Sequence, residues 1–564
     1  MTRGTVLLIA ATAVGLVVRP SGQAPAGEEA APRFEAIDAT IEPLARFVPG
    51  GNTVLRVRFD PNRPLPPPQV RYDTEFGTVV LADDGKGFDA RAGDGQYTAL
   101  GSMDLVAFRN RLMRFVRSRT AVPVRAWRTR AKETLDARLE APHLQAGRQY
   151  PIELWGDPAA IDARRSLMIR DLSVVQDPAR TRGSCGQASM GPWSFGYLMD
   201  QIANTPATGL TGAQLARDWL ETWSTPQVVN GWTVRARPLV QTEILDDWIA
   251  ASGGPGLPLD MSRAPFRLLA IVNRLDLRAQ GAFGGAGGGE LRFVFMHMPT
   301  DCRPGRQFLV IFDYSVPFSG CLNLKAYARQ WRLLSALPIG SPIYNAVLQA
   351  ITQQVVTAGV GAGRVNGSTL EQVRTNENRL DDTGDGLDWE LREFRLDPAS
   401  RGLAMVPLAQ TPDRTLNFSD TLGDYVNLNA PEIVAGDYIV PLQFPGGLPF
   451  RAGSRVYQLS SRHWDASTLR PIMNREARHQ FSLNTCSACH GRETATEFLH
   501  VGGAPFGTPA RLSAFLTGET VADPADGAPV RVFNDLERRA TDLDAFLNMS
   551  CLVSPIDFPL RETH

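Results

Sequence analysis

The sequence predicts a multidomain α+β protein with an N-terminal β-sandwich, a central mixed α+β region and a small, mainly α-helical C-terminal domain. The first observation behind this is length, because 564 residues exceed what one hydrophobic core usually supports. The second is a change of pattern, since strand-like alternation early in the chain gives way to strands and helices in irregular order. The third is an apolar content of 43%, which is enough for cores of ordinary size.

The expected boundaries follow these changes of pattern and composition along the chain. Two short segments, a signal peptide and a linker, precede the three structured parts. In order, the segments are a signal peptide (1–26), a linker (27–33), a β domain (34–165), a central α+β domain (166–482) and a C-terminal domain (483–564).

The N-terminus has the pattern of an export signal. Arg3 gives a short positive region, residues 4–18 are almost entirely apolar, and Ala24-Pro25-Ala26 offers an A-x-A cleavage site. The apolar run is shorter than the roughly 20 residues that span a membrane, although an uncleaved anchor is the alternative. We therefore expect an exported protein, periplasmic or at the cell surface, whose mature chain is not inserted in a membrane.

The first structured part is expected to consist of short β-strands. Residues 53–59 alternate apolar and polar side chains, as a strand with one buried face does. Residues 61–68 contain too many prolines for a central strand, and residues 121–126 and 150–154 are further strand candidates. Such short strands predict a sandwich of two sheets.

A run of aspartates and glycines lies within this β region. Residues 83–97 resemble a hairpin of immunoglobulin-like domains in bacterial surface proteins, although Phe88 departs from that pattern. The resemblance implies an immunoglobulin-like fold. Carboxylate oxygens are suitable ligands for Ca²⁺, and the candidate ligands are Asp83, Asp84, Asp89 and Asp94. The alternative is that these residues only form tight turns.

The central region is expected to combine buried strands with amphipathic helices. Continuous apolar runs predict strands at 267–272, 291–296 and 308–312. Apolar residues at helical spacing predict helices at 192–204, 212–223, 241–251, 324–337 and 341–358. Neither a G-x-S-x-G nor an H-E-x-x-H motif occurs, so the sequence leaves open whether the protein is an enzyme.

The charge balance limits the class of partner. The formal net charge of the chain is −1, so the sequence predicts no surface for nucleic acid or for anionic membranes.

The C-terminal region contains the most specific motif of the chain. Cys486, Cys489 and His490 form a C-x-x-C-H pentapeptide. With 6 cysteines and 7 histidines, chance would produce this pentapeptide in roughly one chain in a thousand of this composition. In c-type haem attachment each thiol forms a thioether with a vinyl group and the histidine binds the iron. The motif therefore predicts one covalent haem c with His490 as the proximal ligand.

Through this motif, residues 483–564 resemble a cytochrome c domain. The resemblance implies single-electron transfer to a redox partner that the sequence does not identify, rather than catalysis. Within this region, residues 510–515 and 533–548 are helix candidates. A buried haem also needs cationic partners for its propionates, and the nearby candidates are Arg475, Arg478, Arg492 and Arg511.

The second axial ligand of the iron stays open at this point. A small cytochrome c usually takes a methionine from a loop before its last helix, but here Met549 is the only methionine after the motif and lies at the end of that helix. His500 and His479 are alternatives, and so is an iron with no second protein ligand. Two protein ligands favour electron transfer, whereas an open position permits ligand sensing or peroxide chemistry.

The main alternative to haem is a structural zinc site. Cys486 and Cys489 with His500 or Cys551 would supply a tetrahedral set of nitrogen and sulfur ligands. A disulfide between the two motif cysteines is a third alternative. In either case the protein would be a cell-surface binding or scaffold protein with a stabilised C-terminal cap.

The four remaining cysteines are expected to form two disulfides in an exported chain. Their proximity in sequence favours a bond between Cys302 and Cys321, which leaves Cys185 to pair with Cys551. Four cysteines allow three pairings, and the sequence does not choose between them.

Overall fold

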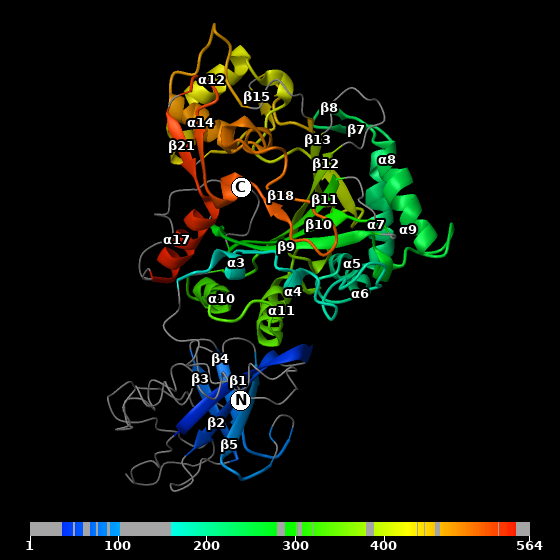
Figure 1. The fold of residues 1–564 in the computed structure, drawn as a ribbon, viewed down its shortest axis with the longest axis vertical. Coiled ribbons are helices and arrows are strands. Elements are labelled where there is room, and N and C mark those ends of the chain that lie inside the picture. The colour runs from blue at the N-terminus through cyan, green and yellow to red at the C-terminus, as the bar shows by residue number, and fades with distance from the viewer. Residues whose placement is uncertain are drawn as a thin grey trace, which may run out of the picture. The chain divides into compact units, whose positions relative to one another are not determined.

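The computed structural model describes most of the chain after residue 35 (Figure 1). The described residues are 36–48, 51–59, 68–74, 77–86, 89, 91–101, 160–278, 288–299, 302, 307–319, 321–378, 389–436, 438–444, 446–456, 463–527 and 529–548. Several predictions lie outside them: the signal peptide, the linker, the strands at 121–126 and 150–154, and the roles of Met549 and Cys551.

The chain divides into two compact units. One comprises Met1–Ala159 with Arg332–Ala350, and the other comprises Ala160–Trp331 with Ile351–His564. The C-x-x-C-H motif thus shares a unit with the central strands, and no boundary between compact units falls at residue 483.

The N-terminal unit contains an antiparallel sheet in which the strand order is β1-β2-β5-β4-β3. Its strands are β1 (Ala36–Val48), β2 (Gly51–Phe59), β3 (Gln69–Thr74), β4 (Gly77–Ala82) and β5 (Gln96–Gly101). The strand predicted at 53–59 is confirmed. A second sheet, which a sandwich needs, is not found among the described residues, so the immunoglobulin-like fold stays a prediction.

The larger unit is built around an antiparallel sheet with eight described strands. In spatial order seven of them are β14 (Leu403–Val406), β13 (Trp389–Leu396), β12 (Leu370–Asn378), β11 (Gln307–Ser315), β10 (Gly288–His297), β9 (Phe266–Arg278) and β6 (Met168–Ile169), and β17 (Arg455–Val456) also pairs with β13. The three strands predicted in this region are confirmed as parts of β9, β10 and β11.

The two faces of this sheet differ in chemistry. The register aligns Phe293, Phe312, Val373 and Phe394 across four strands on one face. Aromatic side chains of α5 (Phe195–Ala203) and α7 (Gly212–Glu221) pack there. Phe195 stacks on Phe266, and Trp219 contacts Phe394 edge-on. This face is therefore the aromatic core of the unit, and α5, α7 and α8 lie on that side in Figure 1.

The opposite face of the sheet mixes apolar side chains with charged and amide groups. The same register aligns Val294, Ile311, Arg374 and Glu393 across β10 to β13, and the adjacent row ends in Asn376 and Leu391. Because successive side chains of a strand point to opposite faces, these residues lie together opposite the aromatic core. The C-terminal elements cover this side of the sheet (Figure 1).

The helices predicted in the centre are confirmed, with shifts of a few residues at their ends. They are α5 (Phe195–Ala203), α7 (Gly212–Glu221), α9 (Asp246–Ala251), α10 (Cys321–Leu334) and α11 (Pro342–Val356). Shorter or unpredicted helices are α3 (Ala163–Ser166), α4 (Leu172–Val175), α6 (Thr205–Thr208), α8 (Pro238–Val240), α12 (Asp420–Leu428) and α13 (Ala430–Ala435).

The C-terminal region is less helical than predicted. Its helices are α14 (Arg475–Leu483), α15 (Cys486–Cys489), α16 (Ala514–Thr517) and α17 (Asp535–Asn548). Two hairpins join them: β18 (Val501–Gly502) with β19 (Arg511–Leu512), and β20 (Glu519–Ala522) with β21 (Val530–Phe533). Four short strands elsewhere form two more hairpins: β7 (Gln227–Val229) with β8 (Trp232–Val234), and β15 (Gln443–Phe444) with β16 (Leu448–Pro449).

One helix prediction in this region is wrong. The helix predicted at 510–515 begins only at Ala514, because Ser513 is extended and acts as the N-cap while the two residues before it form β19. The helix predicted at 533–548 is confirmed as α17.

The predicted disulfide between Cys302 and Cys321 is also wrong. Cys185 is bonded to Cys302, and Cys321 is disulfide-bonded as well. Cys302 lies between β10 and β11, whereas Cys321 follows the far end of β11. Nine residues at about 3.4 Å each place some 30 Å of strand between them, so neighbours in sequence are distant in space.

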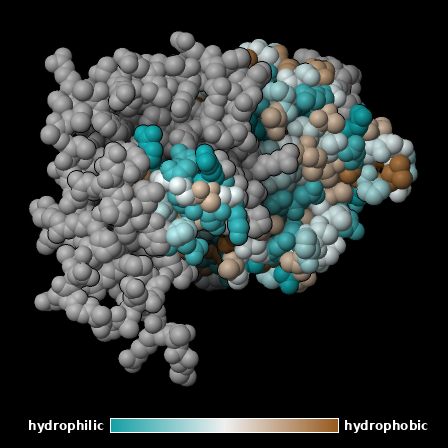
Figure 2. Space-filling view, turned by 90° about the horizontal axis from the view of Figure 1, so that it is seen from below, coloured by the Kyte–Doolittle hydropathy of each residue, from teal (hydrophilic) through white to brown (hydrophobic). Residues whose placement is uncertain are grey.

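Among the described helices, none is both long enough and apolar enough to cross a membrane. On the face drawn in Figure 2, hydrophilic and hydrophobic residues intermingle over the described surface.

Candidate functional site

The C-x-x-C-H motif forms a short helix that is anchored to the core by its middle residues. Thr485 caps α15, since its hydroxyl accepts a hydrogen bond from the Ala488 amide at 3.3 Å. Ala488 is fully buried in a hydrophobic cluster, and Ser487 accepts a hydrogen bond from the indole of Trp464 at 2.9 Å. Fixing these two residues in the core fixes the direction of the flanking cysteines.

The two motif cysteines are thiols, and neither is in a disulfide. Cys486 is partly buried and lines a cavity, and its amide donates to the Thr411 hydroxyl at 3.0 Å. Burial raises the pKa of the Cys486 thiol. Cys489 is buried, and its Sγ lies 2.9 Å from Nε2 of His500.

One ring nitrogen of His490 forms a hydrogen bond to the backbone. Its Nδ1 lies 2.6 Å from the carbonyl oxygen of Phe498, and because a carbonyl only accepts, Nδ1 must carry the proton. Nε2 of the neutral ring is then left with its lone pair, as in histidines that bind metals and donate their other nitrogen to a carbonyl. The ring also stacks on Trp389 with centroids 5.6 Å apart.

The protonation state of His490 suits a metal ligand. Burial lowers its pKa, the Phe498 carbonyl opposes this and the Arg374 charge adds to it, and together they bring the pKa to about 4. The imidazole is therefore neutral at neutral pH.

Phe498 takes a strained backbone conformation to reach His490. Its φ of 63° lies in the left-handed region, which costs a bulky L-residue about 1–2 kcal/mol. Strain of this kind is retained where the surrounding structure enforces it, often at functional sites. Here the side chain of Phe498 stacks on Trp389 and its carbonyl holds the imidazole.

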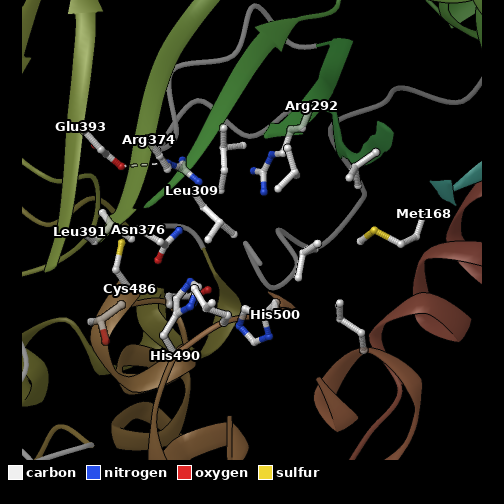
Figure 3. A pocket seen from close by; sticks show the side chains of 18 of the residues that line it. Met168, Arg292, Leu309, Arg374, Asn376, Leu391, Glu393, Cys486, His490 and His500 are labelled. Carbon is white, nitrogen blue, oxygen red and sulfur yellow. Dashed lines mark hydrogen bonds and ion pairs between the residues drawn. The ribbon is translucent and has the colours of Figure 1, made fainter. Parts of the chain in front are cut away.

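The motif opens on a cavity between the sheet face that carries Arg374 and Glu393 and the C-terminal region (Figure 3). The space not filled by protein atoms, including solvent at its mouth, is about 910 Å³. The sheet side is lined by Met168, Val272, Arg292, Val294, Leu309, Ile311, Arg374, Asn376, Leu391 and Glu393, and the other side by Asn484, Thr485, Cys486, His490, Leu499, His500, Val501, Leu516 and Arg539.

Buried arginines on the sheet are the charged groups of the cavity wall. Nε of Arg374 donates to Glu393 at 3.0 Å and lies 3.4 Å from Asp313. Arg292 pairs with Glu290 at 2.6 Å and lies 3.2 Å from the same aspartate. The carboxylates thus fix both guanidinium groups along the wall, and Figure 3 shows both above His490.

The structure does not bring the predicted propionate partners into the cavity. None of the four arginines expected near the motif lines it, whereas Arg292, Arg374 and Arg539 do. Arg478 instead pairs with Glu493 at 2.8 Å and with Asp523 at 2.9 Å. The sheet arginines were missed because their strands precede the motif by more than 100 residues.

The candidates for the second axial ligand lie in different places. His500 lines the cavity beside His490, with ring centroids 4.5 Å apart, and its Nδ1 is 2.8 Å from the Ser513 hydroxyl. His479 lies outside the cavity, with its Nδ1 2.5 Å from Glu493. Met549 lies outside the described residues, so its role stays a prediction.

Among the described residues, the ligands of the predicted zinc site do not lie together, whereas three ligands of the predicted calcium site do. The motif cysteines and His500 do not converge on one point as a zinc set would, because no such trio has ligand atoms within 4.8 Å of one another. Asp83, Asp89 and Asp94 do lie that close, without Asp84. Asp83 accepts the amide of Gly95 at 3.0 Å and Asp89 that of Gly85 at 2.6 Å, which is what tight turns require. Calcium there stays a prediction.

A cluster of buried charged residues connects α14, which precedes the motif, with two segments that follow it. Arg478 of α14 reaches Glu493, which follows the motif, and Asp523 of the last hairpin. Burial would raise the pKa of Glu493, but hydrogen bonds from His479 and Arg478 outweigh it and lower the pKa to about 2. The carboxylate therefore stays ionised far into the acid range.

Acid is expected to weaken the fold through this cluster. Because the folded-state pKa of Glu493 is about 2 and its ordinary value is 4.5, its contribution of about 3 kcal/mol is complete above pH 4.5 and is lost as the pH falls toward 2. Unfolding monitored by circular dichroism between pH 5 and pH 2 should show a weaker pH dependence for Glu493→Gln than for the parent. The exposed Glu497→Gln variant is the control, and equal slopes for the two variants would refute the assignment.

Comparisons with known proteins do not indicate a function. No family model matches the chain, and neither a curated protein nor a solved structure is similar to it. Function is therefore argued from the geometry and chemistry of the cavity.

Proposed function

We propose that the protein is an exported monohaem c-type haem protein that carries single electrons. The observation that carries the proposal is a C-x-x-C-H helix whose histidine is neutral, hydrogen-bonded at Nδ1 and placed at a cavity that Cys486 also lines. Cys486 and Cys489 would hold the haem through thioether bonds, and Nε2 of His490 would bind the iron. When bound, the haem supplies reversible one-electron chemistry.

The residues around the site support this assignment. The Phe498 carbonyl and the Trp389 ring orient the imidazole and prevent it from rotating. Leu309, Leu391 and Leu499 give the cavity an apolar lining that limits water. Arg292 offers a positive charge for a propionate carboxylate.

Export forms part of the proposal. The N-terminal pattern of charge, apolar run and A-x-A site motivates it, and the bond between Cys185 and Cys302 is typical of an oxidising compartment. The redox partner is proposed to be another protein, because the motif residues carry no substrate-binding signature of their own.

The N-terminal unit is proposed to be an immunoglobulin-like domain. The antiparallel order of its five described strands and the aspartate-rich turns between β4 and β5 support this.

A haem assay tests the proposed function directly. Full-length protein made with the haem maturation machinery should give a c-type pyridine haemochrome spectrum and keep its haem after denaturation. The double variant C486S/C489S should lose all covalent haem, because no thiol remains to form a thioether. The control is His463→Ala, a histidine that does not line the cavity. Protein that contains zinc and no haem, or a double variant that keeps covalent haem, would contradict the proposal.

A further inference from the structure

The backbone of the motif would allow its two cysteines to form a disulfide. Cys486 and Cys489 are the first and last residues of α15, three residues apart. In an α-helix this spacing puts the two Cα atoms about 5 Å apart, within the range of roughly 4.4–6.8 Å that disulfides take. Both side chains are nevertheless thiols. The direction of the side chains, and not the distance between the backbones, therefore keeps the two sulfur atoms apart.

Cys486 packs against apolar side chains of the sheet. It lies against a hydrophobic cluster that includes Trp389 and Leu391 of β13. In Figure 3 its sulfur atom points toward Leu391, and the ring of His490 lies between Cys486 and His500. The Cys486 thiol is therefore on the side of His490 that faces away from His500.

Cys489 has a different environment. Its side chain is buried and does not line the cavity that Cys486 lines. Its Sγ lies 2.9 Å from Nε2 of His500, which is a hydrogen-bonding distance for a thiol, a weak donor and acceptor. The two sulfur atoms thus have separate partners, because one packs on apolar side chains and the other contacts an imidazole.

His500 is itself held in place by Ser513. The two residues flank the paired strands β18 and β19, and the Ser513 amide donates to the His500 carbonyl at 2.9 Å. Nδ1 of His500 lies 2.8 Å from the Ser513 hydroxyl, and the ring packs on Phe515 with centroids 5.1 Å apart. Because a hydroxyl accepts as well as donates, Ser513 can accept from Nδ1 while Nε2 accepts from the thiol of Cys489.

Formation of a disulfide would disrupt both environments. Oxidised glutathione would take two electrons from the pair: two S–H bonds break, one S–S bond forms, and the two protons end on two molecules of reduced glutathione. Cys489 would have to rotate away from His500, and Cys486 would have to leave its apolar neighbours. The loss of a hydrogen bond and of packing disfavours the disulfide in the folded chain.

We propose that His500 is a positioning residue that holds the Cys489 thiol away from Cys486, so that the folded chain keeps the motif as a dithiol under oxidising conditions. The proposal rests on the proposed export, because an oxidising compartment is where the pair would otherwise be converted to a disulfide. It does not require bound haem, so its test uses the full-length apoprotein.

Thiol alkylation of the apoprotein tests the proposal. Full-length protein made without the haem maturation machinery is equilibrated with glutathione buffers of rising oxidised fraction. Treatment with iodoacetamide followed by peptide mapping then gives the share of molecules in which Cys486 and Cys489 are both thiols. His500→Leu, which keeps an apolar side chain but removes the ring nitrogens, should raise the equilibrium constant for the disulfide about threefold to tenfold. His500→Gln, which can restore a hydrogen bond to Sγ, should return most of the parent's behaviour.

A matched histidine provides the control. The ring of His463 packs on Phe418 and does not line the cavity, so His463→Leu should leave the equilibrium constant unchanged. If circular dichroism shows that His500→Leu does not fold, Ser513→Ala takes its place and should also favour the disulfide over the parent.

Two results would overturn the proposal. One is an equal equilibrium constant in the parent and in the folded variant that loosens the contact, and the other is a His500→Gln protein that oxidises as readily as His500→Leu. Failure of the proposed function is a separate result, because it would be seen as the absence of covalent haem and would leave this measurement unaffected.

Discussion

Replacing Arg478 with methionine is expected to lower the free energy of unfolding by about 3–5 kcal/mol, because it leaves buried carboxylates without their partner. The side chain is 1% exposed and donates two hydrogen bonds each to Glu493 and Asp523, at 2.8–3.0 Å. It also donates to the Trp464 carbonyl at 3.1 Å. Methionine keeps an unbranched apolar side chain in place of the aliphatic part of arginine, so most of the loss measures charge and hydrogen bonding. Urea unfolding monitored by tryptophan fluorescence checks the result.

A neighbouring arginine gives the control for this experiment. Arg475 lies one turn earlier on α14 and pairs with Asp526 at 2.9 Å, but the two side chains are 57% and 37% exposed. Exposed pairs contribute at most about 1 kcal/mol, so Arg475→Met should change the unfolding midpoint little. Equal effects for the two variants would show that the buried cluster does not stabilise the region around the motif.

Removing the bond between Cys185 and Cys302 is expected to cost about 2–4 kcal/mol, because the bond closes a long loop in the unfolded chain. The sequence separation is 117 residues and spans the helices of the aromatic core together with β9 and β10. The double variant C185S/C302S should melt at a lower temperature than the parent by differential scanning calorimetry. Under the chain-entropy account the loss arises in the unfolded state, so the visible spectrum of the proposed haem should not change.

Reduction of the parent protein distinguishes the effect of losing the Cys185–Cys302 bond from the effect of the two serine substitutions. A mild reductant should lower the melting temperature of the parent toward that of C185S/C302S and should shift the variant less. If the parent and the variant melt at the same temperature without reductant, the bond contributes nothing to stability.

Local patterns in the sequence predicted the strands and most helices of the larger unit. The apolar runs in β9, β10 and β11 are long because those strands are buried on both faces. Helices α7 and α17 carry the periodicity of helices with one buried side. The helix at 510–515 was mispredicted because cap geometry at Ser513, and not periodicity, decides where α16 begins.

Local patterns in the sequence could not predict which residues of the sheet line the cavity. Arg374 and Asn376 reach the motif only through sheet register, which depends on pairings between segments far apart in the chain. One signal was available: Arg292 interrupts an apolar run that reads as a buried strand. A buried charge has to be paired or functional. With 58 Lys and Arg residues in the chain, that signal did not identify a site by itself.

The burial of the motif has a consequence for the order in which the protein matures. Cys489 is 1% exposed, and Cys486 is partly buried where it lines the cavity. An attachment enzyme that must reach both thiols cannot do so once the C-terminal region has docked on the sheet. If the thiols receive haem, they receive it while residues 484–516 are still undocked, and the macrocycle then becomes part of the surface on which this segment closes. Cofactor insertion would thus be a step of folding, and apoprotein that folds first would be a dead end.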